Sequence, residues 1–195
     1  FEKKNNFICK TILYKYLNKD DKIHLKNKLH VNNEDYICFL DPRVNNFLIR
    51  YWVNENKVDN YKKLLQSDND EIEIERIKKC LPNSEIDFEK NKSFILNFGM
   101  DKFNCVSFEK GCYVGQENTA RQKYRGIQKY QLKSLMLSEG KFPSFNEDIY
   151  FNDKKIGKMK SFKNIYGLAL IRNDLKLENI VSLQYGEKKK FSIKV

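Results

Sequence analysis

Hydrophobic and polar residues alternate with different periods along the first half of the chain. Residues 7–17, FICKTILYKYL, place their apolar side chains roughly on one face of a helix, so we expect a helix there. Residues 22–31, KIHLKNKLHV, alternate apolar with polar positions, as a half-buried strand does. Two further strands are predicted at Tyr36–Leu40 and Phe47–Val53, joined by a turn that contains Asp41-Pro42-Arg43.

A helical region is expected after these strands. Residues 58–81 carry a helical pattern at both ends, and the polar segment SDND at 67–70 between them is typical of the cap of a second helix. Pro82 ends this region. Three strands followed by helix are typical of an α+β layer with an antiparallel sheet.

After Gly126 the pattern changes to short strands separated by turn residues. Residues 152–155 and 185–188 are expected to be the turns of two hairpins. This part of the chain carries no helical pattern, which favours a small β-barrel or a sandwich. We therefore predict an α+β domain at 1–127 and a β-barrel domain at 128–195. The predicted strands are YQLKSLML at 130–137, DIYF at 148–151, KIGKMKSF at 155–162, YGLALI at 166–171, IVSLQY at 180–185 and KFSIKV at 190–195.

The size and charge of the chain indicate which classes of partner to expect. Its 195 residues suffice for a sizeable core, and its formal net charge is +11. A basic surface can attract RNA or anionic lipid, but the lysines are scattered among apolar residues, and the longest run is Lys188–Lys190. We interpret the charge as a solvated surface rich in Lys and Asn, so nucleic acid is not an expected partner. No apolar stretch approaches the length of a membrane span, and membrane insertion is not expected.

The five cysteines indicate a reducing compartment. Their number is odd and their spacing irregular, which argues against a disulfide framework. No CxxC pair or His-rich cluster indicates a closed zinc site. His24 and His30 lie far from the other candidate residues in sequence, so a Cys–His catalytic pair is not indicated.

The stretch KGCYVGQENTAR at 110–121 has the clearest chemical character. A strand is expected at Val106–Phe108, then a loop bracketed by Gly111 and Gly115, then a helix from Gln116. The start of such a helix is a positive dipole end, which favours an anion or a thiolate beside it. Cys112 is therefore the candidate for a reactive or metal-accepting sulfur, supported by the neighbouring Lys110.

Two features of this stretch have simpler interpretations. An isolated Cys between glycines is also a common small buried residue, and that alternative remains open for Cys112. Glu117 and Arg121 have the i, i+4 spacing of an ion pair on the surface of a helix.

The segment VSFEKGCYVGQENTAR at 106–121 closely resembles the K-G-C-Y-x-G-Q-E motif of the YgfZ-type proteins. These are folate-binding relatives of the glycine-cleavage T-protein, and their mitochondrial members are iron–sulfur cluster assembly factors. Two weaker matches follow in the family's order. They are Asp41-Pro42-Arg43 with Arg50, and Gly157-Lys158 with Gly167–Leu170.

The resemblance implies a fold and a set of site residues. The fold is a T-protein-like α+β domain with an antiparallel sheet, followed by a small C-terminal β-barrel. Family members extend further ahead of the point that corresponds to Phe1, so the chain is expected to lack their N-terminal portion and to be a processed or truncated product. Cys112 is implied as the functional thiol with Lys110 beside it. The residues implied to shape and support this site are Tyr113, Gly115, Gln116, Glu117 and Arg121.

One departure from the family concerns the cofactor, which the resemblance implies to be tetrahydrofolate. Members often carry Pro-x-Glu-x-Asn upstream of the motif, and here Asn97 stands at the Glu position and Gly99 at the Asn position. An Asn lacks the carboxylate that would form a bidentate bond to a pterin, so folate binding is expected to be weakened. Asp101 remains as a nearby acid, either as a cofactor contact or as a solvated turn residue.

The function implied by the resemblance is that of an assembly factor for [4Fe–4S] proteins in the mitochondrial matrix. A-type iron–sulfur carrier proteins and client [4Fe–4S] proteins are the expected partners, and Cys112 would be one ligand of a transient shared cluster. One alternative is a folate-dependent aminomethyl transferase like the T-protein. Another is an RNA-binding protein linked to tRNA modification. The sequence leaves open whether the chain is an enzyme.

Overall fold

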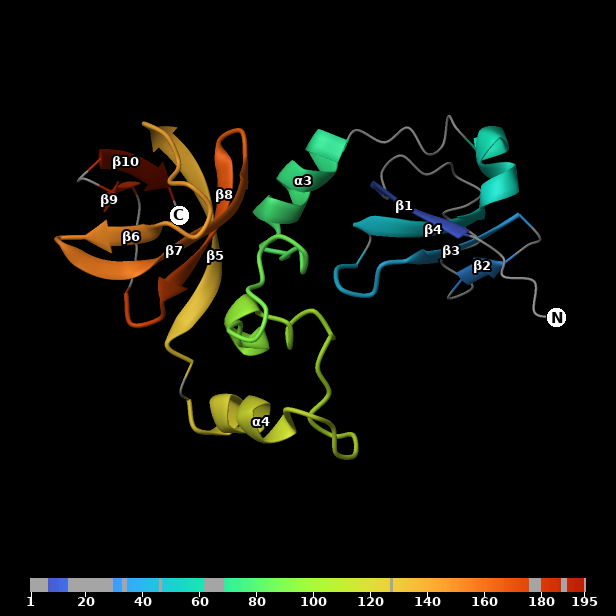
Figure 1. The fold of residues 1–195 in the computed structure, drawn as a ribbon, viewed down its shortest axis with the longest axis horizontal. Coiled ribbons are helices and arrows are strands. Elements are labelled where there is room, and N and C mark those ends of the chain that lie inside the picture. The colour runs from blue at the N-terminus through green and yellow to red at the C-terminus, as the bar shows by residue number, and fades with distance from the viewer. Residues whose placement is uncertain are drawn as a thin grey trace. The chain divides into compact units, whose positions relative to one another are not determined.

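The computed structural model describes residues 7–13, 30–32, 35–45, 47–61, 69–126, 128–175, 180–186 and 189–194 (Figure 1). The chain divides into two units, Phe1–Ile72 and Glu73–Val195. The predicted boundary at residues 127–128 lies within the second unit, just ahead of the first barrel strand. It stays a prediction of where the barrel domain begins.

The first unit contains a four-stranded antiparallel sheet. Its strands are β1 (Phe7–Leu13), β4 (Leu48–Asn54), β3 (Tyr36–Leu40) and β2 (His30–Asn32), in that spatial order. The strands predicted at Tyr36–Leu40 and Phe47–Val53 are confirmed to within one residue. Of the strand predicted at 22–31, only its last two residues lie in the described part of the chain, and they belong to β2.

The helix predicted from residue 7 is wrong. Residues Phe7–Leu13 form a strand that pairs with β4 from Phe7 opposite Asn54 to Leu13 opposite Leu48. The segment is rich in β-branched residues, and pairing with a neighbouring strand decides the structure of such a segment over a short helical period. The rest of the predicted helix, 14–17, lies outside the described residues.

One face of this sheet is buried. Along β4, Ile49, Tyr51 and Val53 are buried, whereas Trp52 between them is 45% exposed. Cys38 of β3 is buried in the same cluster. This alternation is the period-two pattern of a strand with one face on a core.

The helical region predicted at 58–81, with a second helix capped in the SDND segment, contains two separate elements. They are the 3-10 helix η2 (Glu55–Tyr61) and the α-helix α3 (Asn69–Lys78), and residues 62–68 between them lie outside the described residues. The start of α3 at Asn69 agrees with a cap in the SDND segment. The strand predicted at Val106–Phe108 is also wrong, because these residues are irregular and pair with none of the described strands. A three-residue apolar run has no stability as a strand without a neighbour.

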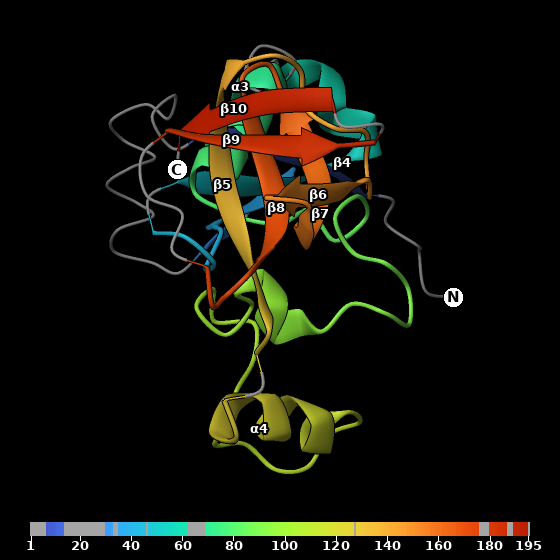
Figure 2. The same ribbon diagram turned by 90° about the vertical axis from the view of Figure 1, so that its left-hand side faces the viewer.

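The second unit ends in a closed six-stranded barrel (Figure 2). Its spatial order is β10-β5-β8-β7-β6-β9, which confirms the barrel over the sandwich. All six predicted strands are present, and Asn152 and Asp153, both with positive φ, form the predicted β6–β7 turn. The strands are β5 (Tyr130–Glu139), β6 (Asp148–Phe151), β7 (Lys154–Lys163), β8 (Tyr166–Arg172), β9 (Ile180–Tyr185) and β10 (Lys189–Lys194).

Two glycines of the weaker family match lie where the barrel leaves no room for a side chain. A Cβ on Gly157 would lie 2.0 Å from the backbone oxygen of Leu170, and one on Gly167 would lie 2.5 Å from the Met159 side chain. Glycine is therefore needed here for close approach between β7 and β8.

The barrel packs against the segment that leads to the KGCYVGQE stretch. Ile77 of α3 and Phe98 of the 3-10 helix η3 (Ile95–Phe98) share one buried cluster with Leu132 of β5 and Leu168 of β8. This cluster fixes η3 beside the start of β5. Among the described residues, no helix has the length and apolar character needed to cross a membrane.

Candidate functional site

A hydrogen-bonded turn at residues 113–116 precedes the helix α4 (Gln116–Tyr124). The Gln116 backbone N–H donates to the Tyr113 carbonyl oxygen at 3.1 Å, and the Tyr113 N–H donates to Gln116 Oε1 at 3.2 Å. Gly115 has φ +86°, a left-handed conformation that favours glycine. Thr119 Oγ1 donates to the Gly115 carbonyl oxygen at 3.0 Å and fixes the turn to the helix. Of the two bracketing glycines, Gly115 alone has a positive φ, and a Cβ on Gly111 would have no neighbour within 4 Å.

Cys112 lies immediately ahead of this turn and is exposed. The exposure excludes the interpretation of Cys112 as a small buried residue. Lys110 Nζ lies 4.8 Å from the centre of the Tyr113 ring, a cation–π distance, so the residues that flank Cys112 contact each other. The arrangement leaves the thiol accessible, three residues ahead of the left-handed Gly115 that caps α4. Its role as the functional thiol stays a prediction.

The charged residues of α4 form surface ion pairs. Arg121 Nη2 lies 2.5 Å from Glu117 Oε1, which confirms the predicted i, i+4 pair. Lys123 Nζ lies 3.1 Å from Asp101 Oδ2. The Asp101 carboxylate is therefore engaged by α4, and this residue lines neither of the two hollows described below.

A hollow of about 350 Å³ lies between η3, α4 and the start of β5. It brings together two residues that the sequence placed at the cofactor site, Asn97 and Arg121. Gln128 Nε2 donates to the Leu96 carbonyl oxygen at 2.6 Å and so attaches η3 to the chain just before β5. The remaining lining residues are Phe94, Asn118, Gln122, Lys129 and Tyr130.

Two buried polar atoms near this region have no hydrogen-bond partner in the described part of the chain. They are Asn97 Oδ1 and the Tyr113 hydroxyl oxygen. A buried acceptor without a donor is costly in a folded protein, commonly about 1–3 kcal/mol. Asn97 therefore carries an unsatisfied acceptor and is also one of the residues that line the hollow.

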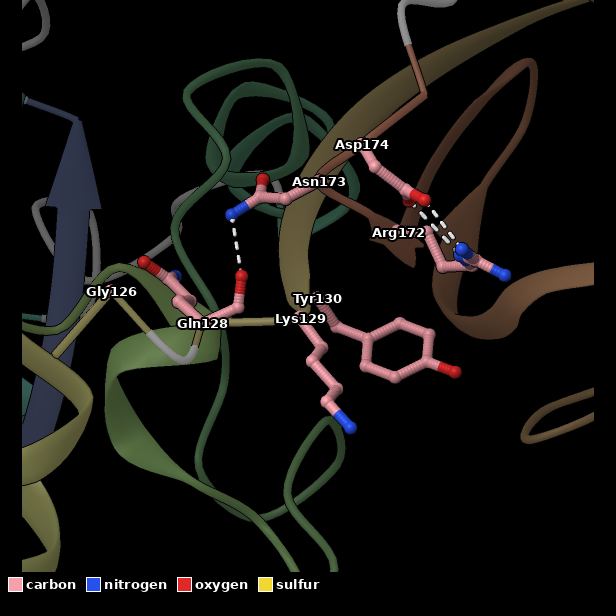
Figure 3. A pocket seen from close by; sticks show the side chains of 7 residues that line it. All are labelled: Gly126, Gln128, Lys129, Tyr130, Arg172, Asn173 and Asp174. Atoms are coloured by element: carbon pink, nitrogen blue, oxygen red, sulfur yellow. Dashed lines mark hydrogen bonds and ion pairs between the residues drawn. The ribbon is translucent and has the colours of Figure 1, made fainter.

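A second, larger hollow of about 690 Å³ lies around the residues just before β5 and just after β8 (Figure 3). Asn173 Nδ2 donates to the Gln128 carbonyl oxygen at 3.0 Å, and Arg172 Nε donates to Asp174 Oδ1 at 3.0 Å. Lys129 and Tyr130 line both hollows. Sequence reasoning missed these residues, because they come from two segments more than forty residues apart and match no motif.

The two other cysteines of the second unit, Cys80 and Cys105, differ in their exposure to solvent. Burial raises the pKa of the Cys80 thiol to about 11, and its Sγ donates to the Leu132 carbonyl oxygen. Cys105 is exposed, and its Sγ lies 3.3 Å from the Phe103 carbonyl oxygen. Within the described ranges, no three His, Cys, Asp or Glu side chains are grouped so that they could hold a metal ion.

The Asp-Pro-Arg match forms an ion cluster in the first unit. The buried Asp41 carboxylate accepts hydrogen bonds from Arg43 Nε at 2.9 Å and Nη2 at 2.7 Å, and from Arg50 Nε at 3.2 Å. Burial acts to raise the pKa of Asp41, but the hydrogen bonds and charges of Arg43, with Arg50, outweigh it and lower that pKa below its ordinary value of 3.8. This motif therefore stabilises the turn between β3 and β4.

The fold of this chain, an α+β part followed by a closed barrel, resembles that of a solved aminomethyltransferase. The crystal structure of glycine cleavage system aminomethyltransferase T from Bartonella henselae matches 84% of this chain and 49% of its own, with a TM-score of 0.61. The two sequences are 12% identical, so this likeness concerns the fold alone.

Two curated proteins of similar sequence have the same name. The chain is 31% identical over 109 residues to the tRNA-modifying protein YgfZ of Yersinia enterocolitica, covering 51% of this chain and 33% of the relative. It is 32% identical over 94 residues to that of Pectobacterium atrosepticum, covering 44% and 28%. The chain therefore spans about a third of the length of these relatives, and no family model matches it. The chain is thus similar in sequence to the YgfZ proteins and in fold to an aminomethyltransferase T, which agrees with the resemblance carried by the KGCYVGQE motif.

Proposed function

We propose that the chain is an assembly factor for [4Fe–4S] proteins in which Cys112 is a cluster ligand or transfer thiol. The observation that carries this proposal is an exposed sulfur next to a turn that internal hydrogen bonds hold in shape. Thiolates are the ligands that iron–sulfur clusters prefer, and the adjoining helix start favours negative charge. The family resemblance independently associates the motif cysteine with this activity.

Cys112 supplies one ligand, whereas an iron–sulfur cluster is commonly held by four cysteines. The proposal therefore requires that a second protein hold the cluster together with Cys112. An A-type carrier protein is the proposed donor and a [4Fe–4S] apoprotein the proposed acceptor. The cluster is cargo in this scheme, and the chain returns to its free thiol after transfer.

The test is anaerobic transfer of a cluster from an A-type carrier to a client apoprotein, followed by the client's absorbance and activity. We expect the wild-type chain to accelerate transfer and Cys112→Ser to abolish the acceleration. Cys105→Ser is the matched control, since Cys105 is also exposed in the same unit. Equal acceleration by Cys112→Ser and wild type would disprove the proposal.

We further propose that tetrahydrofolate, or a related pterin, binds in the hollow of about 350 Å³. The volume is within the range of small-molecule sites, and the residues fit the ligand's groups. Asn97 Oδ1 would accept one ring N–H, Arg121 and Lys129 would attract the glutamyl carboxylates, and Tyr130 would contact the ring. When bound, the cofactor would supply a carrier for one-carbon groups. Calorimetry with tetrahydrofolate tests this binding, and the absence of heat at millimolar ligand would contradict it.

A role in tRNA modification is a second candidate function. The observation in its favour is that the curated relatives are named as tRNA-modifying proteins. Mass spectrometry of tRNA nucleosides from cells depleted of the protein would test it. We expect at least one modified nucleoside to fall and to recover when the gene is restored, and an unchanged nucleoside profile would exclude this role.

The mitochondrial matrix is the proposed location, by resemblance to the mitochondrial members of the family. Free cysteines at Cys38, Cys80, Cys105 and Cys112 agree with a reducing lumen. Immunoblots of fractionated cells should find the protein with matrix markers, and its recovery with cytosolic markers would refute this location.

A further inference from the structure

The two hollows of the second unit are neighbours, because Lys129 and Tyr130 line both. We call their combined lining the basic trough, and its cationic and aromatic members come from four parts of the chain. These members are Phe94, Arg121, Lys129, Tyr130 and Arg172.

The cations of the trough are available to an anionic ligand. Lys129 is exposed, and its ammonium has no partner among the residues that the structure describes. Arg172 is paired with Asp174, but both side chains are exposed, and exposed ion pairs exchange readily for other partners. Arg121 is 53% exposed and is held by Glu117 on one side. A guanidinium has five N–H donors, so each arginine keeps donors for a ligand.

Aromatic rings alternate with these cations. In the view of Figure 3 the Tyr130 ring lies between the ends of Lys129 and Arg172. Phe94, which lines the smaller hollow, is 53% exposed, so its ring is accessible to a ligand. Asn118 and Gln122 of α4 add amide donors and acceptors to the lining.

We propose that the basic trough binds an unpaired segment of RNA. Its phosphates would contact Lys129, Arg121 and Arg172, and its bases would stack on Tyr130 and Phe94. RNA and tetrahydrofolate would therefore exclude each other from the hollow of about 350 Å³. A groove that combines cations with aromatic platforms is how proteins bind single-stranded nucleic acid. Bases within a duplex are already stacked and present no free face to a ring. The choice of RNA rests on the tRNA-directed candidate function, and no part of the argument uses Cys112.

The trough also explains why the sequence predicted no nucleic-acid partner. That prediction was based on the absence of a basic run with interleaved aromatic residues. Here Phe94, the pair Lys129 and Tyr130, and Arg172 are separated along the chain and are brought together by the packing of η3 and β8 against β5.

The test is equilibrium binding of the full chain to fluorescein-labelled oligouridine, measured by fluorescence anisotropy over a series of salt concentrations. An RNA duplex of equal length is the comparison probe. We expect tighter binding to the single strand. Tyr130→Leu should weaken it on the order of tenfold, whereas Tyr130→Phe, which keeps the ring, should bind as wild type does.

The salt dependence of RNA binding tests the contribution of the cations of the trough. Lys129→Gln should reduce the slope of log K against log salt by about 0.7, the value for one phosphate contact on a single strand. Lys141→Gln is the matched control, because Lys141 is an exposed lysine of the same unit outside the trough. Equal effects of these two substitutions, or equal binding of duplex and single strand, would overturn the proposal.

Failure of this inference is distinguishable from failure of the proposed functions. Cys112→Ser should bind oligouridine as wild type does, even though it loses cluster transfer. If tRNA nucleosides depend on the protein but Tyr130→Leu binds oligouridine normally, the tRNA role stands and the trough assignment falls.

Discussion

Arg76 Nη1 lies 3.0 Å from Asp87 Oδ2, and both side chains are almost completely buried. Asp87 also accepts hydrogen bonds from the backbone N–H groups of Asn83 and Ser161, and Arg76 donates to the Leu81 carbonyl and to Ser161 Oγ. The pair therefore joins α3 and the loop after it to β7 of the barrel. Such a cluster is stable because nearly every polar group in it has a partner.

Removing one member of this buried pair should be strongly destabilising. Asp87→Ala leaves the Arg76 guanidinium and two backbone N–H groups without their acceptor, so we expect a loss of about 3–5 kcal/mol in the free energy of unfolding. Urea denaturation followed by circular dichroism measures this loss. Asp148→Ala, which removes an exposed ion pair with Lys155, should cost only about 0–1 kcal/mol. Similar losses of unfolding free energy in both variants would show that the buried pair contributes no more to stability than an exposed pair does.

Acid should weaken the first unit through Asp41. Because the pKa of Asp41 is lower in the folded state than its ordinary 3.8, its ion pairs stabilise the fold fully above that value. This stabilisation is lost as pH falls through the folded pKa. Trp52, the sole tryptophan of the chain, lies in β4 and reports on this unit by fluorescence.

The urea concentration at the midpoint of unfolding should therefore decrease as pH is lowered below about 5, and decrease less in Asp41→Asn, which cannot titrate. Asp41→Asn should also be less stable at neutral pH, by about 1.5–3 kcal/mol, because charged hydrogen bonds from Arg43 and Arg50 are weakened. An identical pH dependence in the variant and wild type would contradict this account of the motif.

Alkylation of the native protein should separate the cysteines. At mildly alkaline pH, Cys112 and Cys105 are exposed and should react with iodoacetamide. Cys38 is buried, and the pKa of Cys80 is raised to about 11, so both should be protected until the protein unfolds. Peptide mass spectrometry after a short pulse reads out each site. Protection of Cys112 while Cys105 reacts would remove the basis for a functional thiol.

The barrel should not tolerate a side chain at Gly157. The added methyl group of Gly157→Ala would meet the Leu170 carbonyl oxygen, so the two strands must separate. Overpacking of this kind costs about 1–3 kcal/mol or more, seen as a lower melting temperature. Gly111→Ala is the control, since open space surrounds that position, and it should change stability by no more than about 0.5 kcal/mol.

Restoring the family carboxylate should strengthen folate binding. In Asn97→Glu two carboxylate oxygens can accept from a pterin ring where Asn97 offers one, and a charged acceptor is worth about 1.5–3 kcal/mol. Calorimetry with tetrahydrofolate should show the gain, and Asn97→Leu should show a loss. Unchanged affinity in both variants would place the pterin elsewhere.

The barrel could be predicted from the sequence because its determinants are local. Apolar and polar residues that alternate over a few positions indicate each strand, and residues such as Asn152 and Asp153 indicate the turns. The prediction of a helix from Phe7 was wrong because the determinants of this segment are not local. Its structure is decided by pairing with β4, some forty residues away, and no local pattern reports that partner.

The part of the candidate site that lies within the contiguous motif could be predicted from the sequence. The turn around Cys112 and the Glu117–Arg121 pair depend on neighbours in sequence. The hollow that joins Asn97 to Arg121 and Lys129 depends on how η3, α4 and β5 pack. Arg172 reaches the second hollow only because β8 is the hydrogen-bonded neighbour of β5 in the barrel.

The two hydrogen bonds between Tyr113 and Gln116 close a small ring within four consecutive residues. Since both donors and both acceptors belong to this short segment, the backbone shape next to the sulfur is held by bonds between sequence neighbours. A substitution of Gln116 should therefore alter the presentation of Cys112 more directly than a change in the barrel would.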